Sequence, residues 1–391
     1  MAIVALVALW VSVAVLAWVY LLYPVLARGY GRLFPVRLAA SAPLPALVSV
    51  GIAVHDGAAE IEDRVANILA APVPFKLEVI VASDGSTDDT SEIVRQLAAT
   101  ESRLRLVELD RAGQSATQSA IFGEAHGDVV VLTDLQTRFE PGCVAALVAP
   151  FADPRVGCVT GVLRWHYDGY TNTARHEGLY WRYEQAVRAW ESRAGWLAAG
   201  TGALLAVRRS MYRPAPANAS LDQMLPLYCR ASGALVVVAS DAIGSDRGTA
   251  SLAELFASRT RIATQGIEAN LRMSVRIAPL RRPMTFLAIW SHKILRWATP
   301  LFALLAVVGG IGLYFDGASP AYLLPVVAAL AVGLLAVVGY VGQRLGRPIP
   351  LTGLALTIAA VNLAFSLAWL NVLLRRPMGA WETAPRGTAG T

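Results

Sequence analysis

Charge is scarce in this sequence of 391 residues, and it is absent from the first 26. Only 16% of the residues are charged and 55% are hydrophobic, and the mean hydropathy is +0.49. An ordinary soluble domain has about 25% charged residues. These values exclude a wholly soluble protein, so we expect part of the chain to lie in a lipid bilayer.

The uncharged amino-terminal stretch is long enough to cross ~30 Å of hydrocarbon at about 1.5 Å per residue. It lacks the basic residues that precede a signal peptide and a clear small-residue cleavage site after the apolar run. We therefore predict a retained transmembrane anchor at residues 1–27. Arg28, Arg32 and Arg37 follow it. The positive-inside rule then places the next segment in the cytoplasm and the amino terminus outside.

Cysteine is also scarce, with three widely spaced residues at 143, 158 and 229 and no C-x-x-C pair. This pattern indicates neither a disulfide framework nor a zinc site, and it fits a reduced cytoplasmic domain. The net charge of +6 raises nucleic acid as a partner. The basic residues gather between Arg259 and Arg296, beside an apolar segment, so we expect a bilayer with anionic headgroups and no nucleic acid.

Residues 40–250 carry the pattern of an α/β domain. Short apolar runs alternate with amphipathic stretches, which predicts a mostly parallel sheet with helices on both faces. The expected strands are 46–54, 77–82, 103–109, 129–133, 156–163, 200–207 and 236–239. The expected helices are 61–69, 90–98, 116–125 and 175–191.

Polar residues follow three of these strands. The run at 129–133 ends on Asp134, the run at 46–54 ends on His55 and Asp56, and the run at 77–82 ends near Asp84. A buried parallel strand cannot hide a charge, so each carboxylate should emerge at the carboxyl edge, where such sheets bind ligands. Each one alone is equally well explained as a helix cap or a solvated turn. Their coincidence predicts one ligand-binding crevice.

Residues 251–297 are basic and amphipathic, which predicts helices lying in the cytoplasmic interface of the membrane. Residues 298–374 contain three apolar spans, and residues 375–391 form a tail. The spans have almost no polar residue, which disfavours a transporter. Alternate crossing places Arg375 and Arg376 outside, against the positive-inside rule, and the sequence leaves that conflict open.

The order and spacing of several short motifs resemble the membrane-integrated, inverting family 2 glycosyltransferases, which include the chitin, hyaluronan and cellulose synthases and the nodulation chitooligosaccharide synthase. The matching segments are 48–50, 83–88, 133–134, 200–203, 222–226, 261 and 291–297. The resemblance implies a cytoplasmic α/β domain of the Rossmann-like GT-A type, with one amino-terminal and three carboxyl-terminal transmembrane segments. It also implies a multi-pass protein of the bacterial inner membrane.

The resemblance further implies a role for individual residues. A nucleotide-sugar donor would contact His55, Asp56, Asp84, Gly85, Ser86, Asp134 and Arg261. Asp134 and Gln136 would bind a divalent metal, Mg²⁺ or Mn²⁺, and Asp222 would be the catalytic base. The acceptor, a carbohydrate or a lipid-linked sugar, would contact Trp181, Gly200, Thr201 and Gly202. Alternatives stay open for three of these residues: a phospholipid contact for Arg261, a helix cap for Asp222, and core packing for Trp181.

Several positions depart from the family's pattern. Gln136 replaces the second aspartate of Asp-x-Asp, so we expect weak metal binding. Gln114 stands in place of a lysine, Leu221 in place of an acidic residue, and Ser258 and Ile262 replace the ends of Q-x-x-R-W. We therefore expect a sugar transferase of cell-surface polysaccharide or glycolipid synthesis. The alternative is a catalytically silent, nucleotide-binding scaffold of a polysaccharide machine.

Overall fold

The computed structural model describes residues 2–166, 172–216, 219–248, 251–277, 280–347, 349 and 352–376. The chain forms two compact units. The sheet unit comprises Arg37–Arg164 and Ala199–Asp246, and the helical unit comprises Met1–Val36, Trp165–Ala198 and Arg247–Arg376.

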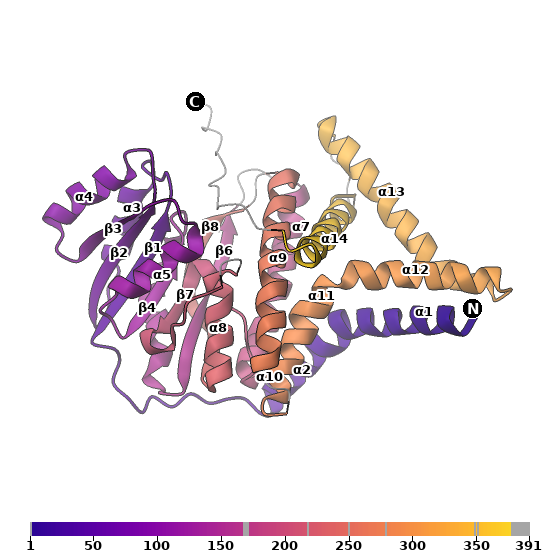
Figure 1. The fold of residues 1–391 in the computed structure, drawn as a ribbon, viewed down its shortest axis with the longest axis horizontal. Coiled ribbons are helices and arrows are strands. Elements are labelled where there is room, and N and C mark those ends of the chain that lie inside the picture. The colour runs from indigo at the N-terminus through magenta and orange to yellow at the C-terminus, as the bar shows by residue number, and fades with distance from the viewer. Residues whose placement is uncertain are drawn as a thin grey trace. The chain divides into compact units, whose positions relative to one another are not determined.

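The sheet unit contains an eight-stranded sheet in the order β3-β2-β1-β4-β7-β6-β8-β5 (Figure 1). The strands are β1 Leu47–Val54, β2 Lys76–Asp84, β3 Leu104–Leu109, β4 Val129–Thr133, β5 Arg138–Phe139, β6 Val156–His166, β7 Leu205–Arg208 and β8 Leu235–Arg247. Strands β3, β2, β1 and β4 pair in parallel. The pairs β4–β7, β6–β7 and β5–β8 are antiparallel, so the expectation of a mostly parallel sheet is wrong beyond β4.

The parallel half is built from the three crossover helices that the sequence predicts: α3 Ile61–Leu69, α4 Thr90–Thr100 and α5 Gln114–Glu124. Two further helices of this unit are α6 Cys143–Val148 and α8 Leu221–Ser232. Helix α5 packs directly on β1, because a Cβ atom at Gly51 would lie 2.3 Å from Ile121 Cγ2. Strands β1 and β4 are almost wholly buried, which explains why their sequences are continuous apolar runs.

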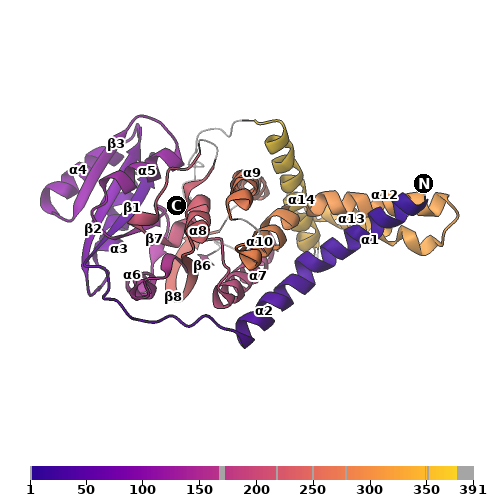
Figure 2. The same cartoon turned by 60° about the horizontal axis from the view of Figure 1, so that its bottom comes forward.

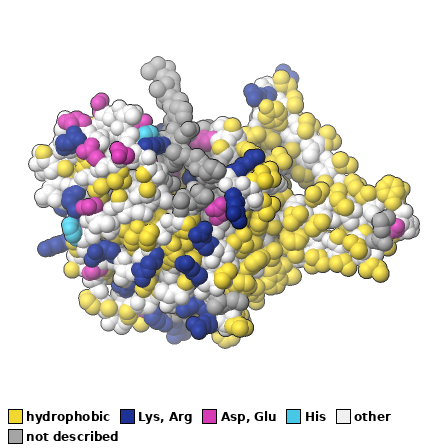
Figure 3. Space-filling model, viewed as in Figure 1, with side chains coloured by type: hydrophobic (Ala, Val, Ile, Leu, Met, Phe, Trp, Pro, Cys, Tyr) yellow, Lys and Arg dark blue, Asp and Glu magenta, His cyan; other side chains and the backbone are white. Residues whose placement is uncertain are grey.

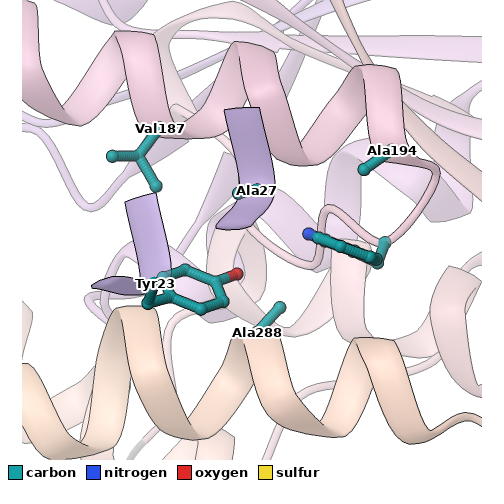
Figure 4. Close-up of a cluster of buried hydrophobic side chains, with 6 residues drawn as sticks. Tyr23, Ala27, Val187, Ala194 and Ala288 are labelled. Carbon is teal, nitrogen blue, oxygen red and sulfur yellow. The ribbon is translucent and has the colours of Figure 1, made fainter. Parts of the chain in front are cut away.

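The helical unit contains α1 Ala2–Ala17, α2 Tyr23–Leu33, α7 Asn172–Ala194, α9 Leu252–Arg276, α10 Pro283–Ala288, α11 Leu295–Trp297, α12 Thr299–Phe315, α13 Leu324–Arg344 and α14 Thr352–Leu373. π-Helical turns at Trp18–Leu22 and Ile289–Ile294 join α1 to α2 and α10 to α11. Helix α1 lies along α12, and α14 packs against α9 and α13 (Figure 2). Helices α2, α7 and α10 share a small apolar cluster that includes Tyr23, Ala27, Val187 and Ala288 (Figure 4).

Among the residues that the structure describes, three helical segments are long and apolar enough to cross a membrane: Ala2–Leu33, Pro320–Arg344 and Thr352–Leu373. Hydrophobic side chains cover the surface over α12 and α13 (Figure 3). The predicted span at 298–315 does not reach this length by itself. It meets the criterion only together with Pro283–Trp297, from which it is bent by 63°. The two segments therefore form either one broken span or a re-entrant loop.

The bend has a local cause at Pro300. This residue has no N–H for the carbonyl of Arg296 one turn earlier, and its ring opposes a continuous helix. The hydroxyl of Thr299 donates to the Arg296 carbonyl at 2.7 Å and replaces the missing bond. The sequence around Pro300 thus ends one helix and begins the next.

Candidate functional site

The ends of β1 and β2 are joined by hydrogen bonds. Asp56 has a left-handed backbone with φ 49°, and its carboxylate accepts from the Thr87 N–H at 2.7 Å. The Asp56 N–H donates to the Ser86 hydroxyl at 3.1 Å. Nδ1 of His55 lies 2.9 Å from the carbonyl oxygen of Asp84. The structure therefore brings four predicted donor-site residues together at one edge of the sheet.

Asp84 itself is fully buried. Its carboxylate accepts from the backbone N–H groups of Ala112 at 2.7 Å and Gly113 at 3.0 Å, and it pairs with Arg111 at 3.1 Å. Gly85 has φ 62°, and a Cβ atom there would lie 2.8 Å from the Arg111 nitrogen. Asp84 thus holds the loop between β3 and α5 against the end of β2. The sequence indicated that this loop is a polar strand end, but sequence reasoning assigned no site residue to it.

At the end of β4, Asp134 and Gln136 are both half-buried. Arg64 of α3 is fully buried and donates to the hydroxyl of Thr133, the residue before Asp134, at 2.7 Å. Burial and the charge of Arg138 lower the pKa of Arg64 to about 9, although Asp134 raises it. Sequence reasoning missed Arg64. The available signal was an arginine on the apolar face of an amphipathic helix.

The residues at β4 fit a divalent metal only with help from a bound nucleotide. Within the described part of the chain, no three His, Cys, Asp or Glu side chains gather to hold a metal ion. Asp134 offers a carboxylate and Gln136 a carboxamide, and Arg64 places a positive charge nearby. Since Mg²⁺ and Mn²⁺ prefer about six ligands, most would come from phosphate oxygens and water.

Asp222 lies in the first turn of α8, where its carboxylate accepts from the Ser220 hydroxyl. It is in close contact with Gly202, since a Cβ atom at 202 would lie 2.4 Å from Asp222 Oδ2 and 3.0 Å from Cγ. Pro226 has no N–H for the carbonyl of Asp222 one turn earlier, so α8 begins with an incomplete hydrogen-bond ladder. The predicted base and the predicted acceptor loop therefore meet.

Ser115 connects this region to the loop held by Asp84. Its hydroxyl donates to the Ala219 carbonyl at 2.9 Å and accepts from the Leu221 N–H at 3.2 Å. Ser115 lies two residues after Gly113. The short backbone segment from Gly113 to Ser115 thus links the hydrogen bond to Asp84 with those to the beginning of α8. Nothing in the sequence pattern indicated Ser115.

Trp181 and Arg261 belong to the helical unit. The ring of Trp181 lies 5.3 Å from that of Trp165, and the guanidinium of Arg259 lies over it at 5.2 Å. Arg261 is half-buried on α9. The roles of Trp181 and Arg261 beside the donor or the acceptor stay predictions.

The helical unit also contains a buried charge cluster centred on Glu184. The Glu184 carboxylate pairs with Lys293 at 2.7 Å and Arg296 at 2.6 Å, and His292 bridges it to Glu191. Burial alone would raise the pKa of the Glu184 carboxyl, but Lys293, His292 and Arg296 hold it well below its ordinary value. The expectation that the basic residues of 259–296 face lipid headgroups is therefore wrong for Lys293 and Arg296, which bind a protein carboxylate.

The comparisons with known proteins match one part of the chain to a family. Residues 49–213 match the sequence family described as glycosyl transferase family 2. Residues 49–213 are a family 2 glycosyltransferase domain. A mannosyltransferase from Pyrobaculum calidifontis, solved in complex with GDP-Man and Mn²⁺, superposes with a TM-score of 0.71. It is 22% identical and covers 95% of this chain and 99% of its own, which confirms the predicted GT-A fold.

Two curated relatives of the family 2 domain are N-acetylglucosaminyltransferases. That of Rhizobium meliloti strain 1021 is 25% identical over 285 residues, 69% of this chain and 63% of the relative. That of Rhizobium leguminosarum bv. trifolii is 34% identical over 92 residues, 23% of this chain and 50% of the relative. The chain thus spans less than two thirds of either relative's length. The family match includes the residues from His55 to Gln136 and ends before Asp222.

Proposed function

We propose that this protein is a membrane glycosyltransferase that moves a sugar from a nucleotide-sugar donor to a carbohydrate or lipid-linked acceptor. The contact between Gly202 and the carboxylate of Asp222 carries the proposal, because it gives one carboxylate a fixed place beside the predicted acceptor loop. We assign the product to cell-surface polysaccharide or glycolipid synthesis.

In the proposed reaction, the acceptor hydroxyl oxygen attacks the anomeric carbon, and its proton passes to Asp222. The bond between that carbon and the donor phosphate breaks, and its electron pair leaves with the nucleoside diphosphate. A single carboxylate that acts as a base gives one displacement, so the configuration at the anomeric carbon inverts. A retaining reaction would require a second carboxylate to act as nucleophile.

The donor side is assigned to the edge of the sheet formed by β1, β2 and β4. His55, Asp56, Gly85 and Ser86 would contact the nucleotide, and Asp84 would act through the loop that it holds. Asp134 and Gln136 would hold Mg²⁺ or Mn²⁺, which when bound neutralises negative charge on the leaving diphosphate. The mannosyltransferase structure with GDP-Man and Mn²⁺ supports a metal of this kind.

As the resemblance implies, Arg261 is proposed to bind the diphosphate and Trp181 the acceptor. A phospholipid contact remains the alternative for Arg261. For Trp181 the alternative is packing, which its contacts with Trp165 and Arg259 support.

For the whole chain we propose a multi-pass protein of the bacterial inner membrane. The anchor is residues 1–27, the cytoplasmic catalytic domain 40–250, the interface helices 251–297, the membrane region 298–374 and the tail 375–391. The three segments that are long and apolar enough to cross a bilayer support this arrangement.

To test the proposal, the purified full chain is incubated with a panel of nucleotide sugars, beginning with UDP-N-acetylglucosamine and GDP-mannose. Mass spectrometry identifies the products, and NMR gives the anomeric configuration of the new glycosidic bond. Asp222→Asn should abolish transfer and leave donor affinity unchanged, because it removes the base but no diphosphate contact. Asp241→Asn is the matched control, since this carboxylate is exposed on β8.

Transfer at the wild-type rate by Asp222→Asn would refute the assignment of the base. A wild-type protein that binds nucleotide but yields neither product nor donor hydrolysis would instead support the silent scaffold. The incomplete metal ligand set at Asp134 and Gln136 is the observation that favours this second function.

A further inference from the structure

The helical unit contains a cavity of about 220 Å³ lined by Arg28, Gly31, Arg32, Trp190 and Arg193. None of these residues has a place in the proposed reaction. Three of the five carry a fixed positive charge, and none carries a carboxylate.

Close approach of two helices forms this cavity. Gly31 of α2 lies against α7, since a Cβ atom at 31 would lie 2.9 Å from the Trp190 carbonyl oxygen. Arg28 and Arg32 are one turn apart on α2, so they project from the same side of the helix. Trp190 and Arg193 stand on the facing helix α7, and the guanidinium of Arg28 lies 5.6 Å from the Trp190 ring. The glycine thus allows three arginines from two helices to converge.

Within the described part of the chain, the three arginines pair with no carboxylate. Among the ion pairs of the described residues, none includes Arg28, Arg32 or Arg193. On the same helix α7, Arg188 pairs with Glu184 at 2.9 Å, so this part of the fold does supply carboxylates to arginines elsewhere. Converging guanidinium groups repel one another unless an anion lies between them. Among the described residues, the cavity therefore presents positive charge without a carboxylate.

The position of the cavity along the chain indicates where that charge comes from. Helix α2 completes the apolar segment Ala2–Leu33, and Arg28 is the first charged residue after 27 without charge. A cluster of arginines at the polar end of a membrane-spanning helix lies at the depth of lipid headgroups. Leu33 and Phe34 beside it expose 75% and 62% of their surface, which suits contact with acyl chains.

We propose that the cavity between α2 and α7 binds the phosphate group of an anionic phospholipid. The planar guanidinium forks of the three arginines bind the phosphate oxygens in pairs. The indole of Trp190 supports Arg28 and lies at the boundary between headgroup and hydrocarbon. The site differs from the basic stretch 259–296 that the sequence assigned to headgroups.

The experiment titrates the full chain in detergent with dioctanoyl phosphatidylglycerol and counts bound lipid by native mass spectrometry. Each arginine at a membrane surface contributes about a fivefold factor in binding, so the triple variant Arg28→Gln, Arg32→Gln, Arg193→Gln should bind about a hundredfold more weakly. Arg344→Gln is the matched control, because Arg344 ends α13 and lies outside the cavity. It should bind as wild type does.

Two further arms identify the ligand. Dioctanoyl phosphatidylcholine, which has no net charge, should bind weakly and equally to wild type and triple variant. Inorganic phosphate alone should give no bound species at the same concentration. Arg193 is exposed, and Arg193→Glu would supply a carboxylate to Arg28 and Arg32. This single change should also abolish specific phosphatidylglycerol binding. It provides a test if the triple variant does not fold.

Equal phosphatidylglycerol binding by wild type, triple variant and Arg193→Glu would overturn the proposal. An equal loss in the Arg344→Gln control would overturn it too, because the effect would then be general charge attraction. Binding of inorganic phosphate with the affinity of the lipid would refute the lipid as its source.

Discussion

Gly202→Ala tests whether the position of the Asp222 carboxylate matters. The new methyl carbon would lie 2.4 Å from Asp222 Oδ2, whereas ordinary van der Waals contact begins at 3.4 Å. The carboxylate must therefore retreat by about 1 Å, and a displacement of this size at a reacting group can cost on the order of 10²-fold in rate. We expect kcat to fall about a hundredfold and the KM for the donor to stay unchanged.

The same change should leave the fold intact. Gly202 is not among the residues with positive φ, so alanine fits its backbone. Rotation of the Asp222 side chain moves its carboxylate away, and its Cβ, 3.1 Å from the added methyl carbon, has to shift by a few tenths of an ångström. The assay compares initial rates of transfer and thermal unfolding for wild type, Gly202→Ala and Gly123→Ala. Gly123 is a helical glycine, and a Cβ atom added there would have no neighbour within 4 Å, so this control should transfer sugar normally. Transfer by Gly202→Ala within about twofold of wild type would refute the reasoning.

Three further outcomes are expected. In calorimetric titration, Mn²⁺ should bind the wild-type protein only when nucleoside diphosphate is present. Asp134→Ala should abolish this binding and Gln136→Asp should tighten it. Binding that neither change affects would contradict the assignment. Glu184→Gln should lower the free energy of unfolding by about 3–5 kcal/mol at pH 7. Because the folded-state pKa of Glu184 is depressed, the stabilisation by its carboxylate is present above about pH 4.5 and lost at lower pH. The melting temperatures of wild type and Glu184→Gln should therefore converge in acid. A difference in melting temperature that stays constant with pH would refute this account. Ser115→Ala should lower kcat about fivefold, because loss of one hydrogen bond is expected to raise the barrier by about 1 kcal/mol. Ser115→Thr, which keeps a hydroxyl, should restore kcat. Equal rates in wild type and both variants would show that Ser115 has no positioning role.

Periodicity predicted the parallel half of the sheet well because each element there has a strong local signal. The strand at β1 and the helix at 61–69 were found nearly to the residue, since one is a continuous apolar run and the other an amphipathic stretch. The antiparallel half has no comparable signal. Strand direction depends on which strands pair across the chain, and β7 pairs with β4 across more than 70 residues.

The candidate site shows the same division between local and distant information. That Asp56 and Asp134 follow the ends of their strands agrees with the burial of those strands, and the structure puts both there. Asp84 also ends its strand, but the expectation that its carboxylate emerges is wrong, because it is fully buried and accepts from backbone N–H groups. What Asp84 does there was not predictable, because its partners Ala112 and Gly113 donate through the backbone, which any residue type can do. The role of Ser115 was not predictable for a similar reason, because its hydroxyl bonds main-chain atoms of a segment about a hundred residues away.

The basic residues before α12 show how composition alone can mislead. Lys293 and Arg296 stand next to an apolar segment, so electrostatics near a membrane favoured lipid phosphate as their partner. Their actual partner, Glu184, is more than a hundred residues earlier on α7 and carries no sequence sign of the pairing. A buried carboxylate with such partners cannot be lost without leaving several cations uncompensated. No carboxylate among the described residues pairs with Arg28 or Arg32 at the end of α2. This difference distinguishes the charges that stabilise the helical unit from those proposed to bind a ligand.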